Sequence, residues 1–240
     1  LSKSILPFNL YKPDLVLLPI TIKEERGIKK VEIHTATDLR KEGFLNSSKW
    51  FGDIERIWNL QKTEKSKTMS ANDRIDFQRG LTDQNLNARY LVLYNASAKD
   101  ANATVVERTN LDLEFFVESK GYVLFTNNEN EAYYLTSILN STAPNEMMKD
   151  FQTKGLFGAR DVHKKILDVY FPKYDAASKI HNQLAALGKS CHSKAAQYVK
   201  DNPPQQALSA IHLGRLRLAI KKHLAAEMDA IDALVKKILG

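Results

Sequence analysis

The chain has 240 residues, of which 43% are hydrophobic, and this is enough for one large globular domain or two small ones. Its formal net charge of +7 suits an acidic partner such as nucleic acid, although many proteins without such a partner share it. The single cysteine excludes an internal disulfide and fits a cytoplasmic location, and no apolar run approaches the roughly 20 residues that span a membrane.

The first residues carry the signals of an irregular segment. Pro7 and Pro13 punctuate residues 1–13, and we predict a linker there. Because the chain begins at Leu1 and not at methionine, we expect this linker to arrive from an upstream domain.

Short strands and helices follow. Residues 15–22 and 30–34 are predicted to be strands on either side of a charged turn. Apolar residues at steps of three and four predict a helix over residues 50–61, whose two tryptophans are expected to belong to the core. The polar and basic run at residues 62–68 is predicted to be a mobile loop, and residues 70–79 a short helix stopped by the next glycine.

The middle of the chain has the strongest strand signals. Residues 89–94 (RYLVLY) and 103–107 are predicted to be strands, joined by a polar turn. Residues 113–118 and 122–125 are predicted to form a second, tight hairpin. Helical character begins after residue 128, with a helix over residues 131–139.

Towards the end, apolar residues form two narrow seams at helical spacing. The first contains Ile180, Leu184, Leu187, Cys191, Ala195 and Tyr198, and the second Ile220, Leu224, Met228, Ile231, Val235 and Ile238. Such seams predict two long helices, and the short connection at residues 201–206 predicts that they pack antiparallel. The second helix, from about residue 208 to residue 239, would be roughly 48 Å long at about 1.5 Å per residue.

These signals together predict an α+β protein. We expect a mixed, mostly antiparallel domain over residues 1–172, followed by a long antiparallel helical hairpin over residues 173–240. Such a hairpin has no pocket of its own, and we expect it to be a spacer or docking element.

Three short motifs resemble parts of catalytic or metal sites, and each has a sufficient structural interpretation. Asn202–Gln205 (NPPQ) resembles the Asn-Pro-Pro-aromatic motif of amino-methyltransferases, but Gln cannot stack on a flipped base, and Asn202 is predicted to cap the last helix. Glu118–Lys120 resembles half of a nuclease site but leads into a glycine turn. Cys191 and His192 lack the partners of a zinc site. We therefore expect no catalytic and no metal-binding residue here.

The most informative segment is residues 151–165 (FQTKGLFGARDVHKK). Two glycines bracket a Leu-Phe pair, which predicts a tightly turned backbone from which polar side chains project. Arginine and lysine on a rigid loop suit phosphates or guanine edges. The alternative is a solvated basic loop that supports the core.

The predicted DNA contacts come from this segment and from the basic run at residues 62–68. They are Gln152, Lys154, Arg160, His163, Lys164 and Lys165, with Lys62, Lys65 and Lys67 from the basic run. The lysines would mainly neutralise phosphates, whereas Arg160 or Gln152 could read base edges. Arg160 could equally pair with Asp161 or cap a helix.

Several stretches resemble one family. They are Arg89–Asn95 (RYLVLYN), Asn130–Ser141 (NEAYYLTSILNS), Gly155–Lys164 (GLFGARDVHK) and Ile231–Gly240 (IDALVKKILG). Together they resemble the C-terminal region of adenine-specific DNA methyltransferases of restriction–modification systems, of the type IIG and Taq-like kind. The resemblance covers residues 85–240 well and the first 80 residues loosely.

The resemblance implies a target-recognition domain that reads double-stranded DNA. In that family an upstream domain binds S-adenosylmethionine and methylates adenine N6, so that this region itself holds no cofactor. The helical hairpin also resembles the spacer helices of type I specificity subunits, which dock on a partner subunit. Two alternatives therefore stand beside DNA recognition: a helical scaffold that docks a partner methyltransferase subunit, and a self-contained nuclease.

Overall fold

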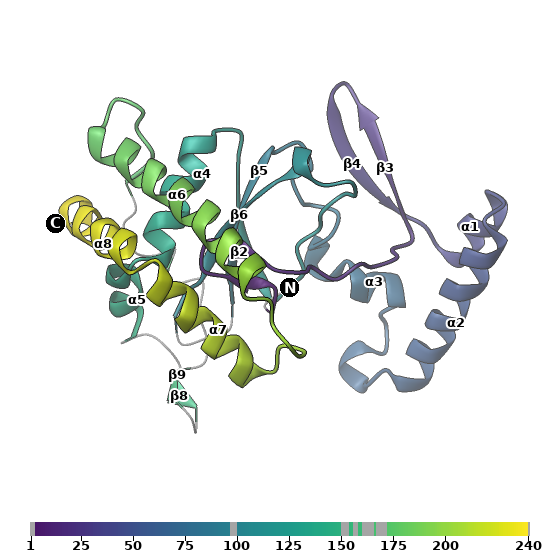
Figure 1. Ribbon diagram of the computed structural model, residues 1–240. Helices are drawn as coiled ribbons and strands as arrows, with labels where there is room; N and C mark the ends of the chain where they lie inside the picture. Colours follow the sequence, from purple (N-terminus) through teal and green to yellow (C-terminus); the bar gives the residue numbers. More distant parts are fainter. Residues whose placement is uncertain are drawn as a thin grey trace. The chain divides into compact units, whose positions relative to one another are not determined.

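The computed structural model describes residues 3–96, 100–149, 154–155, 158–159, 166 and 172–239, with backbone only at 154–155 and 158–159 (Figure 1). By contacts between residues, the chain divides into two compact units. Unit 1 consists of Leu1–Asp14, Ala88–Phe115 and Ser119–Gly240, and unit 2 consists of Leu15–Asn87 and Phe116–Glu118. The boundary expected after residue 172 therefore does not separate the two units.

The centre of unit 1 is a three-stranded antiparallel sheet. Its order is β6 (Ala103–Glu107), β5 (Tyr90–Asn95), β7 (Gly121–Thr126). Every residue of β5 is buried, as its run of aromatic and branched residues predicts. The hairpin expected around residue 120 is absent from the described residues, because residues 113–118 form no strand there and β7 pairs with β5 instead.

The expected linker at residues 1–13 is wrong for the residues that the structure describes. Residues 3–12 contain two short paired strands, β1 (Ile5–Leu6) and β2 (Asn9–Leu10). The side chains of Ile5, Leu6 and Phe8 are fully buried, and the Phe8 backbone N–H donates to the carbonyl of Ala103 at 2.8 Å. This segment packs beside β6, at the edge of the three-stranded sheet, and is part of the core.

The C-terminal helices are α6 (Lys179–Asp201), α7 (Ala210–His223) and α8 (Ala225–Leu239). Both predicted apolar seams face inward. The expected single second helix is wrong, because Leu224 ends α7 at φ −96° and ψ 16° and α8 begins after it. The Leu224 side chain is fully buried, so the seam continues through the break.

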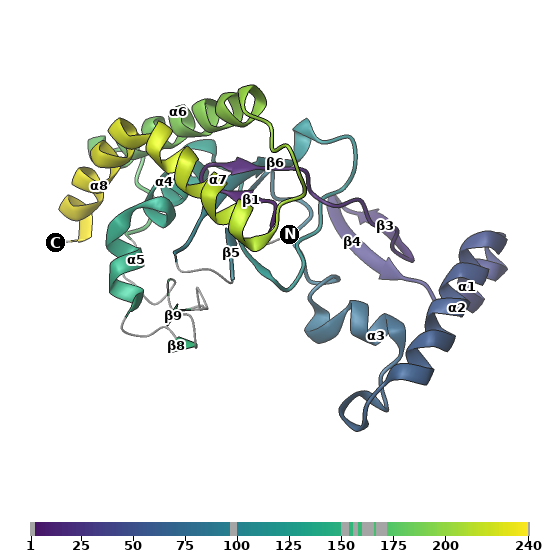
Figure 2. The same ribbon diagram turned by 60° about the horizontal axis from the view of Figure 1, so that its bottom comes forward.

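The antiparallel packing of these helices is confirmed by contacts between them. Lys194 of α6 forms an ion pair with Glu227 of α8. The Tyr198 and His223 rings lie 4.8 Å apart. The C-terminal half of α6 thus contacts the end of α7 and the start of α8, so the chain after α6 runs antiparallel to it (Figure 2).

These helices are not a spacer that stands apart from the core. Helix α4 (Glu129–Asn140) contacts all three strands of the sheet, and α6 packs closely on α4. A Cβ atom built on Gly188 of α6 would lie 2.5 Å from the carbonyl oxygen of Tyr133 in α4. The Ser137 hydroxyl donates to the carbonyl of Leu184 at 2.8 Å. The α6 backbone therefore contacts α4 directly, through a small residue.

The expected role of Asn202 as an N-cap is also wrong. Asn202 is the C-cap of α6, and its backbone N–H and side-chain amide both donate to the carbonyl of Tyr198, at 2.9 and 3.0 Å. The next helix begins at Ala210 with Ser209 as its N-cap. The Asn-Pro-Pro sequence therefore ends one helix and does not start another.

Unit 2 begins with a hairpin of β3 (Ile20–Glu25) and β4 (Ile28–Ile33). Its helices are α1 (Ala36–Lys41), α2 (Leu45–Gln61) and α3 (Ala71–Ile75), with the 3-10 turns η1 (Glu64–Ser66) and η2 (Phe77–Arg79). The two tryptophans of α2 do not share a buried face: Trp50 is 60% exposed, whereas the half-buried Trp58 donates through Nε1 to the carbonyl of Met69 at 2.7 Å.

Candidate nucleic-acid interface

The segment that carries most of the predicted DNA contacts lies largely outside the described residues. This holds for Gln152, Arg160, His163, Lys164 and Lys165, and for the side chain of Lys154. The described backbone consists of β8 (Lys154–Gly155) and β9 (Gly158–Ala159). The strands pair antiparallel with Gly155 opposite Gly158, so the chain reverses between the two glycines, as their positions predict.

Described residues on either side of this segment pack or form hydrogen bonds in unit 1. Met148, at the end of α5 (Thr142–Met148), and Ile166 are both buried. On the far side, the Tyr134 hydroxyl of α4 donates to the carbonyl of Pro172 at 2.8 Å. Described residues before and after β8 and β9 therefore belong to unit 1, and β8 and β9 lie on the same side of that unit as α5 (Figure 2).

The basic run of unit 2 has a defined conformation. The Thr63 backbone N–H donates to the Ser66 hydroxyl at 3.0 Å, which closes the turn η1. Lys62 is half-buried and ends α2, while Lys65 and Lys67 are exposed. Lys67 pairs with Glu64 at 3.2 Å. The run predicted to be a loop thus contains the short turn η1 and presents two exposed lysines, of which Lys67 is already paired.

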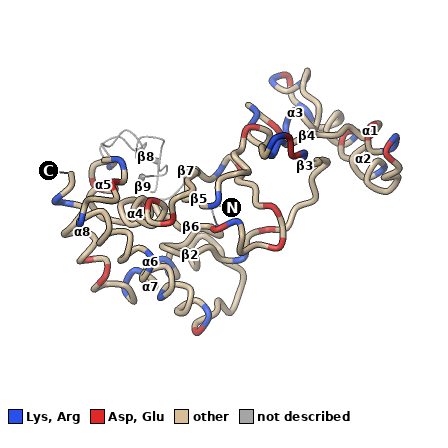
Figure 3. Tube along the Cα trace, turned by 90° about the horizontal axis from the view of Figure 1, so that it is seen from above, with Lys and Arg blue, Asp and Glu red and all other residues tan. Residues whose placement is uncertain are grey.

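In unit 1, basic residues concentrate on α7, which contains Arg215, Arg217, Lys221 and Lys222 and no acidic residue (Figure 3). Two of them face the protein. The Arg217 guanidinium donates to the carbonyl of Ile5 at 2.7 and 3.2 Å, and desolvation lowers the pKa of Arg217 to about 10. Desolvation also lowers the pKa of Lys221. Arg215 and Lys222 are exposed to solvent and available to an anionic partner.

Cys191 and His192 form no metal site with other described residues. Cys191 is fully buried, and desolvation raises the pKa of its thiol to about 12, which keeps the thiol protonated and unreactive. No group of three or more His, Cys, Asp or Glu side chains that could hold a metal ion occurs in the described part of the chain.

His192 is instead a half-buried base, and it makes stability depend on pH. Burial lowers its pKa, opposed by a hydrogen bond with the Phe8 backbone. A lowered pKa means that the unfolded chain binds the proton more readily, so stability should fall as pH drops below about 6.5, the unfolded value.

Replacing His192 by Gln removes the titrating group. We expect the loss of unfolding free energy between pH 7 and pH 5 to be smaller in His192→Gln than in the parent, as measured by urea denaturation. An equal loss in both proteins would contradict this assignment.

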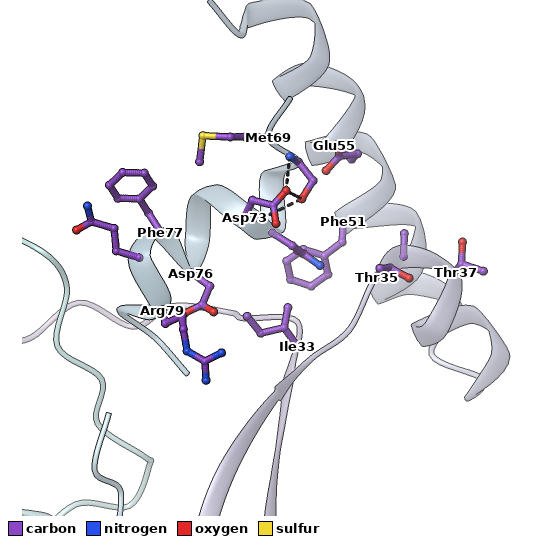
Figure 4. Close-up of a pocket in the computed structure, with 14 residues that line it drawn as sticks. Ile33, Thr35, Thr37, Phe51, Glu55, Met69, Asp73, Asp76, Phe77 and Arg79 are labelled. Atoms are coloured by element: carbon purple, nitrogen blue, oxygen red, sulfur yellow. Dashed lines mark hydrogen bonds between the residues drawn. The ribbon is translucent and has the colours of Figure 1, made fainter. Parts of the chain in front are cut away.

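Unit 2 has a shallow depression of about 760 Å³ next to α3 (Figure 4). Apolar side chains, including those of Ile33, Phe51 and Met69, line part of it. Its carboxylates already have partners: Glu55 accepts from the Ala71 backbone N–H at 2.8 Å, and Asp73 closes the capping box of α3. The depression therefore lacks an unpartnered acid of the kind that general acid–base catalysis needs.

One rim of the depression is a strained turn. Gln78 has φ 55° and Arg79 has φ 58°, so two consecutive side-chain-bearing residues occupy the left-handed region. Each such residue costs roughly 1 kcal/mol or more in backbone strain. The predicted helix over residues 70–79 is too long, because α3 ends at Ile75 and this turn follows it. Gln and Arg have no preference for left-handed backbone that a pattern could reveal.

Comparison with protein-family models and with curated protein sequences finds no match for this chain. No described helix combines the length and the apolar character that crossing a bilayer requires.

Proposed function

We propose that this chain recognises double-stranded DNA sequence-specifically, as the C-terminal part of an adenine-N6 DNA methyltransferase of a restriction–modification system. It acts in the cytoplasm beside an upstream domain that binds S-adenosylmethionine and performs the chemistry. The chain itself supplies recognition and no catalytic group.

The observation that carries the proposal is the reversal between the paired strands β8 and β9, which occurs in a chain whose flanking residues Met148, Ile166 and Pro172 pack or form hydrogen bonds in unit 1. A segment that reads DNA must keep its polar side chains in a fixed register with the base pairs. A chain reversal between flanking residues that belong to the core can provide this register. The same segment carries the Gly155–Lys164 stretch that resembles the methyltransferases.

The salt dependence of duplex binding tests this proposal. A labelled duplex library titrated with the chain should give a fluorescence anisotropy change at 50 mM salt. If about four phosphates are neutralised, the affinity should fall roughly 100-fold between 50 mM and 200 mM salt, because bound counterions are released. Enrichment of a randomised duplex pool should yield a consensus sequence. Binding that is absent at low salt, or an enriched pool without a consensus, would overturn the proposal.

Two double variants that remove the same charge distinguish phosphate contacts made by Lys164 and Lys165 from a general effect of net charge on DNA affinity. Lys164→Gln with Lys165→Gln should reduce the slope of log affinity against log salt by about 1.8, since each phosphate contact contributes about 0.9. Lys236→Gln with Lys237→Gln removes the same charge from two exposed positions at the end of α8. We expect this control pair to leave the slope nearly unchanged. Equal effects of both pairs would mean that net charge alone drives binding.

A second candidate function is docking of a partner methyltransferase subunit on the helices. On α7, Ile211 is 67% exposed and Leu218 is 56% exposed, and Arg215 lies between them in sequence. Exposed apolar residues at this spacing lie on one side of a helix and suit a partner surface. This function becomes the stronger candidate if the chain binds no duplex DNA even at low salt.

A further inference from the structure

The strained turn of unit 2 has a conformation fixed by a single carboxylate. Asp76 accepts hydrogen bonds from the Leu81 and Thr82 backbone N–H groups, both at 2.9 Å, and from the Thr82 hydroxyl at 2.8 Å. The Arg79 backbone N–H donates to the Asp76 carbonyl at 2.7 Å. These bonds connect the residue before the turn with the residues after it, and they hold the left-handed Gln78 and Arg79 in place.

The side chains of the turn point away from this hydrogen-bonded base. Gln78 and Arg79 are exposed, and Phe77 is 49% exposed. Phe77 and Arg79 leave the turn in different directions (Figure 4). Folding gives no reason for a glutamine at position 78, because its side chain makes no hydrogen bond with the described residues and glycine would fit the backbone without strain.

Arg79 is oriented by a neighbouring acid. Its Nε donates to both carboxylate oxygens of Asp83, at 2.9 and 3.0 Å, and Nη2 lies 2.8 Å from Oδ1. The edge formed by Nε and Nη2 is thus occupied by Asp83, while Nη1 and the second N–H of Nη2 remain available. One N–H of Nη1 and this second N–H of Nη2 are parallel, and such a pair matches the O6 and N7 acceptors of guanine.

We propose that the turn Phe77–Gly80 is a second base-contacting element, in which Gln78 and Arg79 read base edges in the major groove. This inference rests on the proposed function in DNA recognition. The amide of Gln78 can donate to N7 and accept from N6 of adenine, as Arg79 can donate twice to guanine. The strained backbone places two adjacent residues of these types on one rigid turn.

The turn should contribute specificity and little general affinity. Asp73, Asp76 and Asp83 lie close to Arg74 and Arg79 in sequence, so this part of the surface has no excess of positive charge. Phosphate attraction, which depends on such an excess, is therefore not its expected role. Removal of the Gln78 and Arg79 side chains should therefore change which DNA sequence is bound, and it should leave the salt dependence of the affinity unchanged.

The test uses the double variant Gln78→Gly with Arg79→Gly, which removes both side chains at positions where glycine relieves strain. Its urea unfolding midpoint should equal or exceed that of the parent, so that lost binding cannot be ascribed to unfolding. Affinity for the parent's enriched consensus duplex should fall about tenfold or more, with the salt slope unchanged. Enrichment with the variant should lose one or two base-pair positions of that consensus.

Arg26→Gly is the matched control, because Arg26 is also an exposed arginine with left-handed backbone in unit 2, at φ 53°. We expect it to keep the full consensus. If the double variant selects the parent's consensus with the parent's affinity, the turn does not read bases, whereas DNA recognition itself stands. If the parent enriches no consensus, the proposed function fails before the variants are compared. An equal loss with Arg26→Gly would also overturn the assignment to the turn.

Discussion

Replacement of Gly188 by alanine should destabilise unit 1 by about 2–3 kcal/mol, even though alanine is the better helix former by about 1 kcal/mol. The added Cβ would lie 2.5 Å from both the Tyr133 carbonyl oxygen and the Ser137 hydroxyl, and 3.2 Å from the Tyr133 carbonyl carbon. These contacts are mostly with backbone, which cannot rotate away as a side chain can. Relief requires α6 to move off α4, which loosens the buried residues between them. Urea denaturation followed by circular dichroism measures the loss.

Gly214 provides the control for this prediction. It lies in the exposed part of α7, and a Cβ built there would meet no atom within 4 Å. Gly214→Ala should therefore stabilise the protein by about 0.5–1 kcal/mol, since only helix propensity changes. Opposite signs for the two substitutions would establish the close contact of α4 with α6. A neutral or stabilising effect of Gly188→Ala would show that the two helices are not packed this closely.

Replacement of Asn140 by leucine should lower the free energy of unfolding by about 1–3 kcal/mol. Asn140 is buried at the end of α4, where its side chain accepts from the Ala103 backbone N–H at 3.0 Å and donates to the Ala103 carbonyl at 2.9 Å. Leucine has a similar volume and no polar atoms, so it leaves the buried Ala103 N–H without its partner, whereas the Ala103 carbonyl keeps the Phe8 backbone N–H. A buried backbone group without a partner costs roughly 1–3 kcal/mol. The same urea titration measures the effect.

Asn130 is the matched control in the same helix. It is exposed near the start of α4, so Asn130→Leu should change the unfolding free energy by less than about 0.5 kcal/mol. A small effect at both positions would mean that water replaces the Asn140 side chain at β6. A large effect at Asn140 alone would identify it as the link between helix and strand.

The parts of the fold that were predictable are those fixed by local periodicity. The seam through Leu184 and Cys191 and the seam through Ile231 and Val235 are buried as their spacing predicts, and β5 has the burial expected of its apolar run. A helix or strand with one buried face carries this information in its own sequence.

The errors arise where distant residues decide the structure. The segment with Ile5 and Phe8 resembles a linker by its prolines, yet it is ordered by Ala103 and by Arg217, the latter 212 positions away in sequence. The break at Leu224 leaves the apolar period intact, so no pattern could indicate it. The exposure of Trp50 likewise depends on which face of α2 packs inward.

For the candidate interface, the sequence indicates the segment at residues 151–165 but not how its neighbouring residues contact the core. The glycines at positions 155 and 158 predicted a reversal that the strand register confirms. The anchoring by Tyr134 and Pro172 could not be predicted, because a hydroxyl and a carbonyl 38 residues apart leave no joint signal in one sequence. The turn at Gln78 was missed for the related reason that its strain is set by the bonds of Asp76.

The division of the chain into units has a consequence for how such proteins can diversify. The chain leaves unit 1 after Asp14 and returns at Ala88, so nearly all of unit 2 is one insertion between β2 and β5. Two recombination points would suffice to exchange it, except that Val117 exchanges two hydrogen bonds with the Gln84 side chain, at 2.8 and 2.9 Å. A chimaera that imports a foreign insert must therefore import its counterpart of residues 116–118 as well.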